Sequence, residues 1–409
     1  MRLHFGTLLL AAICTAATAT VTSPLREAGP SAEVRALWVQ RGSLTSASAI
    51  VALVDSAKAA GFNTLLVQVR GRGDAYYKSR LEPRAAALAA EHPTFDPLAL
   101  VIATAHQAGL RVHAWVNVNL VAGAELPSAE SHVIYSHPEW LMVPRELAGE
   151  LASADRRSPA YVARLARYAR DHSDAIEGLY LSPIEPAAAG YTVNVIADIA
   201  ARYAVDGIHL DYIRFPNDEF DYSPSAIAQF RAAIVSGLNL AERREYERRA
   251  EGRPILYTQM FPQRWQEFRR DKLTALLVRV RAAVKAKRRK AVLSAAVWPD
   301  AAEAANHRLQ DWRGWVGAGL LDVVCPMAYT ADAAVFRSQI ARVKQIAGRR
   351  PVWAGIGAYH LSASETIENI RAARRLGAQG IILFSYDNLV AGANGDGQYL
   401  PKVGRESFK

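Results

Sequence analysis

Cysteine is almost absent from this 409-residue chain, in which only Cys14 and Cys325 occur. Once an N-terminal segment that contains Cys14 is removed, no intrachain disulfide can form. Cys325 lies within an apolar stretch, where we interpret it as core packing. Stability must therefore come from a hydrophobic core, and a composition of 51% hydrophobic residues allows a large one.

Several catalytic motifs are also missing. No HxH or HExxH spacing accompanies His113 and His209, so a metal site built on these two histidines is disfavoured. No GxSxG elbow is present, which argues against a serine hydrolase of that type. The stretch GRGD after the second predicted strand lacks the GxGxxG spacing of a nucleotide site. The sequence therefore implies no cofactor and no metal.

A long hydrophobic run is absent as well, although the N-terminus is apolar. Residues 1–19 combine a basic start at Arg2, an apolar run over residues 8–13 and the small triplet Ala17, Thr18, Ala19. This pattern predicts a secretory signal peptide cut after Ala19, because about 20 apolar residues would be needed to span a bilayer. We expect a secreted or periplasmic protein without a membrane span.

The chain has a formal net charge of +10, which falls to +9 when Arg2 leaves with the signal peptide. For an exported protein, this charge favours anionic polymers of the cell envelope over nucleic acid as partners. The arginines also cluster in charged helical segments, which are typical of solvated faces. A nucleic-acid-binding function is therefore disfavoured.

Eight β-rich runs alternate with helical patterns after a linker over residues 20–32. The runs are residues 33–39, 62–74, 110–120, 206–213, 291–298, 320–329, 351–359 and 380–388. This alternation indicates a parallel sheet, and eight strands favour a closed (β/α)8 TIM barrel over residues 33–392. Long insertions are predicted after strand 3 (residues 121–200) and strand 4 (residues 217–290), with a C-terminal tail over residues 393–409.

Polar residues share one face on three neighbouring strands. Because strand side chains alternate, His209 and Asp211 face opposite to Ile208 and Leu210, and we expect them inside the barrel. The same test groups Gln68 with Arg70 on the second strand and His113, Trp115, Asn117 and Asn119 on the third. Active sites of such barrels lie at the C-terminal strand ends, so the sequence predicts a site there. A buried ion-pair network without chemistry is the alternative.

Carboxylates surrounded by amide, arginine and aromatic side chains suit glycoside chemistry. Asp211 is the predicted nucleophile or general base, with His209 and Arg214 holding its charge and orientation. A cation such as Arg70 or Arg214 is expected within about 4 to 6 Å, which would lower its pKa. The candidates for the acid are Asp300, which shares a strand face with Trp298, Glu185 and Asp74. The predicted substrate contacts are Arg70, His113, Asn117, His209, Arg214, Trp298, Tyr329 and Tyr386.

Several long motifs in fixed order resemble the glycosyl-hydrolase-like 10 family. They include EVRALWV, VQVRGRGDAYYKSRLEP, HAWVNV, DGIHLDYIRFP, WQEFRRDKLTALL and GIILFSYDN, and the resemblance runs from about Glu33 to Asn388. It implies a (β/α)8 glycosidase fold in bacterial envelope proteins that act on peptidoglycan glycan strands. Compared with the DGxDxDxE pattern of chitinase-like barrels, Ile213 replaces the terminal acid, and Ser182 stands where the family is expected to have Asn.

The resulting prediction is an exported glycoside hydrolase that acts on envelope polysaccharide, with peptidoglycan glycan as the expected substrate. A non-catalytic, lectin-like glycan-binding barrel is the alternative. It would keep the aromatic and amide groups but need no paired carboxylates, and the missing chitinase-type acid is the argument in its favour.

Overall fold

The computed structural model describes residues 33–391 and 397–408. The predicted signal peptide and linker, residues 1–19 and 20–32, lie outside the described residues. None of the helices in the described ranges is long and apolar enough to cross a membrane.

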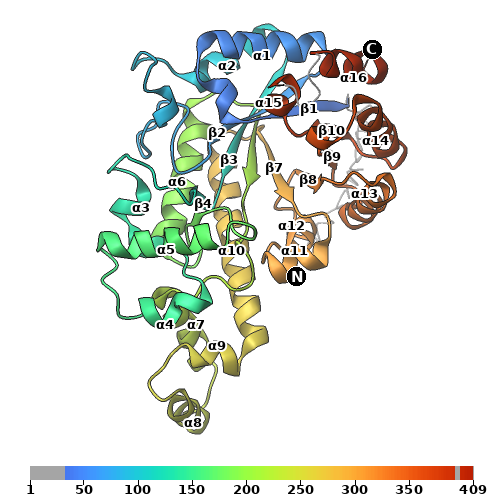
Figure 1. Ribbon diagram of the computed structural model, residues 1–409. Coiled ribbons are helices and arrows are strands. Elements are labelled where there is room, and N and C mark those ends of the chain that lie inside the picture. The colour runs from blue at the N-terminus through green and yellow to red at the C-terminus, as the bar shows by residue number, and fades with distance from the viewer. Residues whose placement is uncertain (1–32, 392–396, 409) are drawn as a thin grey trace, which may run out of the picture. The chain divides into compact units, whose positions relative to one another are not determined.

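Eight parallel strands close into a barrel, which confirms the predicted (β/α)8 fold (Figure 1). Each strand hydrogen-bonds to the next around the ring, and β10 pairs with β1 to complete it. The strands are β1 (Val34–Val39), β2 (Thr64–Arg70), β3 (Arg111–Asn117), β6 (Gly207–Asp211), β7 (Val292–Val297), β8 (Val323–Ala328), β9 (Trp353–Ile356) and β10 (Gly380–Leu383).

Helices surround the barrel, and side-chain caps define where many of them begin. Ser46 and Asp96 each accept a backbone N–H at the start of their helices, and Ser362 forms a capping box with Glu365. The helices outside the two insertions are α1 (Ala47–Ala59), α2 (Pro97–Gln107), α11 (Ala301–His307), α12 (Trp312–Gly317), α13 (Ala333–Ala347), α14 (Ala363–Arg375), α15 (Tyr386–Ala391) and α16 (Tyr399–Ser407). Within the predicted tail, α16 packs against α1 and α14.

The barrel separates two apolar cores. Ile208 and Leu210 belong to the outer core between the strands and the helices. Trp38, Leu66 and Trp115 belong to a smaller core inside the barrel. The predicted alternation of faces is therefore confirmed for these strands.

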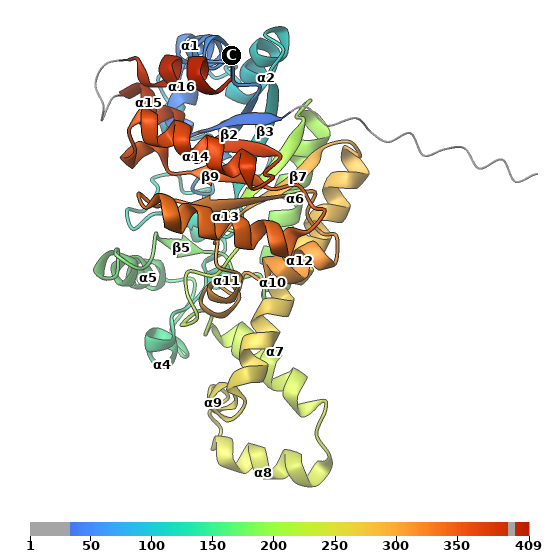
Figure 2. The ribbon, with the colours of Figure 1, turned by 90° about the vertical axis from the view of Figure 1, so that its right-hand side faces the viewer.

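Two long insertions follow β3 and β6, as predicted. The first, over residues 118–206, contains a two-stranded antiparallel sheet and has an apolar cluster of its own. Its elements are β4 (Leu120–Ala122), α3 (Val133–Ser136), α4 (Ala148–Leu151), α5 (Pro159–Asp171), β5 (Leu179–Tyr180) and α6 (Pro186–Arg202). The second contains α7 (Pro224–Val235), α8 (Leu240–Ala250) and α9 (Leu256–Met260), which extend away from the barrel, and α10 (Pro262–Lys287) (Figure 2).

Candidate active site

A cavity of about 750 Å³ lies at the carboxyl ends of the barrel strands. Its lining side chains come from the ends of the strands, from the loops after β1 and β2, and from the first insertion. The polar lining residues are Gln40, Arg41, Thr45, Gln68, Arg72, Tyr76, Asn117, Glu177, Asp211, Tyr212, Arg214, Tyr329 and Gln339. Among the described residues that line it, two carry carboxyl groups, Glu177 and Asp211. This end of the barrel is where enzymes of this architecture place their chemistry.

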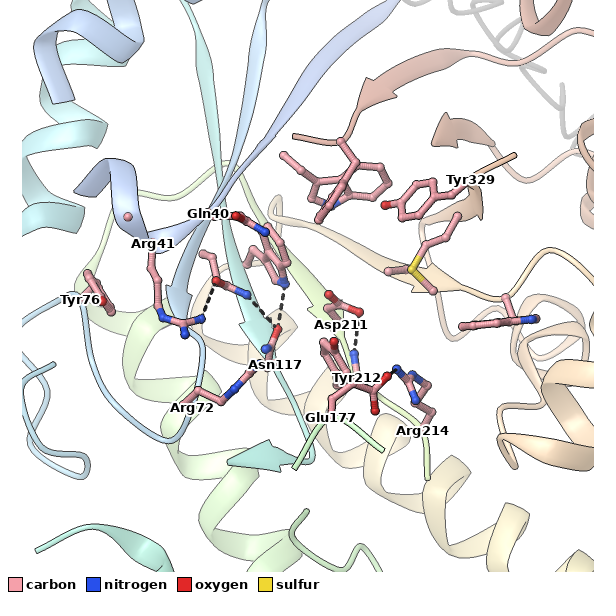
Figure 3. Close-up of a pocket in the computed structure, with 18 of the residues that line it drawn as sticks. Gln40, Arg41, Arg72, Tyr76, Asn117, Glu177, Asp211, Tyr212, Arg214 and Tyr329 are labelled. Atoms are coloured by element: carbon pink, nitrogen blue, oxygen red, sulfur yellow. Dashed lines mark hydrogen bonds and ion pairs between the residues drawn. The ribbon is translucent and has the colours of Figure 1, made fainter. Parts of the chain in front are cut away.

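Asp211 is the last residue of β6 and its side chain enters the cavity (Figure 3). It is 8% exposed, and its Oδ1 accepts the backbone N–H of Tyr212 at 2.7 Å. Tyr212 has a φ of 48°, a left-handed conformation that is costly for a bulky residue and is typical of functional sites. Burial raises the pKa of Asp211 from 3.8 to about 6, against the opposing charge of Arg214.

Glu177 is the second carboxyl group, and it comes from the first insertion just before β5. Its Oε1 accepts a hydrogen bond from Arg214 at 2.7 Å, and its Oε2 accepts one from the Tyr180 hydroxyl. Burial opposes ionisation, but the charge of Arg214 and these hydrogen bonds lower the pKa of Glu177 below its ordinary value. Glu177 is therefore held as an ionised carboxylate.

Gly178 fixes where Glu177 lies. A Cβ atom on Gly178 would be 2.0 Å from the backbone oxygen of Ala122, and its φ of 145° disfavours other residues. The antiparallel pair β4 and β5 can therefore approach closely only with glycine here. This approach carries Glu177 from the insertion to the cavity that Asp211 lines.

The two carboxyl groups thus have opposite environments. Asp211 is desolvated and keeps its proton to a higher pH than usual, while Glu177 is stabilised as an anion by a cation and a phenol. Paired carboxyl groups whose pKa values are pushed apart are the signature of an acid and a base or nucleophile in one site.

A scan against family models matches residues 33–359 to glycosyl hydrolase-like 10. The chain belongs to the glycosyl hydrolase-like 10 family. It is 23% identical over 300 residues to the glycosyl hydrolase YngK of Bacillus subtilis, a match that covers 68% of this chain and 48% of YngK. It is 24% identical over 309 residues to the glycosyl hydrolase DigH of Escherichia coli K12, covering 69% of this chain and 57% of DigH. The chain thus spans about half the length of these curated relatives.

Solved structures of glycoside hydrolases share the fold. The glycoside hydrolase domain of PgaB (BpsB) from Bordetella bronchiseptica superposes with a TM-score of 0.62 at 16% identity, covering 90% of this chain and 98% of that domain. A beta-galactosidase from Bacillus circulans gives a TM-score of 0.61 at 11% identity, covering 92% of this chain and 56% of that enzyme. At these identities the likeness concerns the fold alone.

The two arginines expected to pair with Asp211 form ion pairs with other carboxylates. Arg214 pairs with Glu177 at 2.7 Å, and Arg70 pairs with Glu82 at 2.7 Å with both side chains fully buried. The prediction of a lowered pKa for Asp211 was therefore wrong, because burial outweighs the charge of Arg214. A β-bulge between Gln68 and Arg70 also interrupts the alternation of β2, so Arg70 does not follow Gln68 into the cavity.

The two predicted histidines lie inside the barrel and do not line the cavity. The indole N–H of Trp38 donates to His209 Nε2 at 2.9 Å, so Nδ1 carries the proton and donates to Ser294 Oγ. Burial lowers the pKa of His209 to about 3 and that of His113 to about 4. Both rings are neutral, and His209 supplies no charge to hold Asp211.

Asn117, Trp298 and Tyr329 line the cavity together with Asp211 and Arg214. Asn117 is held by three groups: Trp115 Nε1 donates to its Oδ1 at 3.0 Å, Gln68 donates to the same atom at 3.4 Å, and its own amide donates to the Gly71 oxygen. These five predicted residues are therefore brought together.

The other predicted carboxylates and Tyr386 do not line it. Asp300 lies beyond the end of β7 and caps α11, accepting the N–H groups of residues 302 and 303. Glu185 caps α6 and accepts the hydroxyl of Ser225. Asp74 accepts the backbone N–H of Arg72. Tyr386 is a buried residue of α15, because β10 ends at Leu383 and not at the predicted residue 388.

Glu177 was missed because its signal is weak. It precedes a strand of only two residues, inside an insertion whose place depends on contacts distant in sequence. The glycine that follows it in the run IEGLYLSP was the available clue. Among the described residues, no group of three or more His, Cys, Asp or Glu side chains could hold a metal ion.

Proposed function

We propose that this protein hydrolyses glycosidic bonds of envelope polysaccharide, with the glycan strands of peptidoglycan as its substrate. The observation that carries the proposal is the pair Glu177 and Asp211, two carboxyl groups of opposite protonation tendency in one cavity of a glycosidase fold. Membership of the glycosyl hydrolase-like 10 family supports it. The predicted signal peptide over residues 1–19 supports export to the periplasm or beyond.

Asp211 acts as the general acid and Glu177 as the nucleophile or base in this proposal. The protonated Asp211 donates its proton to the glycosidic oxygen as that bond breaks. Glu177 attacks the anomeric carbon, or removes a proton from the water that does so. This assignment reverses the predicted role of Asp211 and replaces Asp300, Glu185 and Asp74 as its partner.

Other lining residues position these groups and the sugar. Arg214 and Tyr180 hold the Glu177 carboxylate in one orientation through its two oxygens. The amides of Asn117 and Gln68 are hydrogen-bonded to each other and shape the cavity wall, and Trp298 presents an aromatic ring to the cavity.

The test is release of glycan fragments from purified peptidoglycan, with binding to the same glycan followed by pull-down. We expect Asp211→Asn and Glu177→Gln to lower turnover by several orders of magnitude, since each removes a reacting group with little change in volume. Asp300→Asn is the matched control, because Asp300 lies outside the cavity and an asparagine still caps α11.

The competing function is the lectin-like barrel. It is favoured by the fact that both Glu177 oxygens already have protein partners, as in a purely structural ion pair. A wild-type protein that binds peptidoglycan and other envelope glycans but releases no fragment from any of them would establish that function and refute hydrolysis.

A further inference from the structure

The cavity has a second charged wall opposite the two carboxyl groups. Arg41, Arg72 and Tyr76 lie on one side of it, whereas Glu177 and Asp211 lie on the other (Figure 3). We refer to Arg41 and Arg72 as the cation wall. Neither arginine takes part in the acid and base chemistry proposed above.

The Arg41 guanidinium is held in a defined position. Its Nη1 donates to Oε1 of the buried Gln68 at 3.1 Å. It also packs on the backbone at Gly71, where a Cβ atom would lie only 2.4 Å from Arg41 Nη1. A solvated surface arginine needs neither contact, so the place of Arg41 is built into the fold.

Arg72 is tied to the same glycine. Its Nη1 donates to the Gly71 oxygen at 3.1 Å, and that oxygen also accepts the amide of Asn117 at 2.8 Å. Gly71 therefore makes room for one guanidinium and binds the other, next to an amide that lines the cavity. The wall is one hydrogen-bonded unit that runs from Arg41 to Asn117.

Within residues 33–391 and 397–408, no carboxylate neutralises the positive charge of the cation wall. Among the described residues, no carboxylate lies within 4 Å of either guanidinium, whereas the third arginine of the cavity, Arg214, is paired with Glu177. Asp74 accepts the backbone N–H of Arg72 and not its guanidinium. Two fixed guanidinium groups without a counter-ion are suited to bind an oxyanion, since charge-assisted hydrogen bonds of this kind are about twice as strong as neutral ones.

We propose that Arg41 and Arg72 bind a carboxylate carried by a sugar of the substrate, so that the site selects acidic glycans. This inference rests on the proposed function for its substrate, but it concerns binding and can be tested without turnover. The amides of Gln68 and Asn117 act as positioning groups for the wall.

The experiment measures binding by calorimetry to the full-length Asp211→Asn protein. Two probes are compared: peptidoglycan glycan strands freed of peptides, which carry free carboxylates, and the same strands after coupling of those carboxylates to methylamine. We expect the free-acid strands to bind about 10- to 100-fold more tightly. Adding Arg72→Gln should remove most of this difference by weakening only the free-acid complex.

Arg349→Gln is the matched control, because it removes the same charge from an exposed residue before β9, at the opposite end of the barrel. Equal affinity for the two probes, an Arg72→Gln variant that keeps the full difference, or a protein that binds neither these probes nor a polymer of uronic acid would overturn the inference. Discrimination in a protein that hydrolyses no glycan would refute the proposed function and leave the cation wall established. If peptidoglycan strands do not bind but a polymer of uronic acid does, and its binding depends on Arg72, the cation wall binds a carboxylate as proposed. Peptidoglycan is then excluded as the ligand.

Discussion

Replacing Asp211 by asparagine should stabilise the folded protein at neutral pH. Burial raises the pKa of Asp211 from its ordinary 3.8 to about 6, so the folded state resists ionisation of this group. One pKa unit corresponds to about 1.4 kcal/mol, and the rise of about two units corresponds to about 3 kcal/mol. The wild type loses this stability as the pH rises from about 4 to 6, because its folded pKa lies above its unfolded pKa. The Asp211→Asn protein has no ionisable group at this position, so it does not lose this stability as the pH rises.

The assay is urea denaturation of both proteins from pH 4 to pH 8. We expect the difference in unfolding free energy to be small at pH 4, to grow towards pH 6 in favour of Asp211→Asn, and then to stay constant. Asp322→Asn is the control of opposite sign, because hydrogen bonds from Lys285 and Arg281 outweigh the burial of Asp322 and lower its pKa. A difference between Asp211→Asn and wild type that does not depend on pH, or that favours the wild type above pH 6, would refute the argument that burial dominates at Asp211.

Three further predictions follow from the same site. The kcat/KM for glycan release should fall as the pH rises through about 6, because the acid Asp211 must be protonated; a rate that stays constant to pH 8 would contradict this. Glu177→Gln should destabilise the protein by about 1 to 3 kcal/mol in thermal or urea unfolding, since it removes the charged partner of the buried Arg214 while Glu177 itself is partly exposed. Gly178→Ala should abolish glycan release even in folded protein, whereas Gly149→Ala, which has no atom within 4 Å of its new Cβ, should leave release unchanged.

The barrel, and the part of the site that lies on the strand ends, could be predicted from the sequence because both follow from strand periodicity. Alternation placed Asp211 and Asn117 on the inner face, and the carboxyl ends of parallel strands necessarily meet. The same rule failed at Arg70, because a β-bulge between Gln68 and Arg70 adds a residue to the strand and the sequence pattern does not predict it. It also failed at Asp300, because β7 ends at Val297 and the chain then turns to start α11.

Glu177 could not be predicted for a different reason. Its position is set by the close approach of Gly178 to Ala122, 56 residues apart in sequence, and by the ion pair with Arg214, 37 residues away. Likewise, the pKa of Asp211 stays raised because Arg214 forms its ion pair with Glu177 and not with Asp211. Tertiary packing decides which carboxylate Arg214 pairs with, and this leaves no periodic signal in the sequence.

The first insertion has a hydrophobic cluster of its own, which includes Val121, Leu141 and Leu165 and is separate from the barrel cores. A segment that carries its own core can detach and re-form as a cooperative unit while the rest of the molecule stays native. Glu177 lies where this cluster meets the barrel, because Leu179 and Leu181 belong to the cluster whereas Ile176 and Tyr180 belong to the outer core. The distance between the two carboxyl groups therefore depends on the packing of both units, and loosening either one would shift Glu177 relative to Asp211.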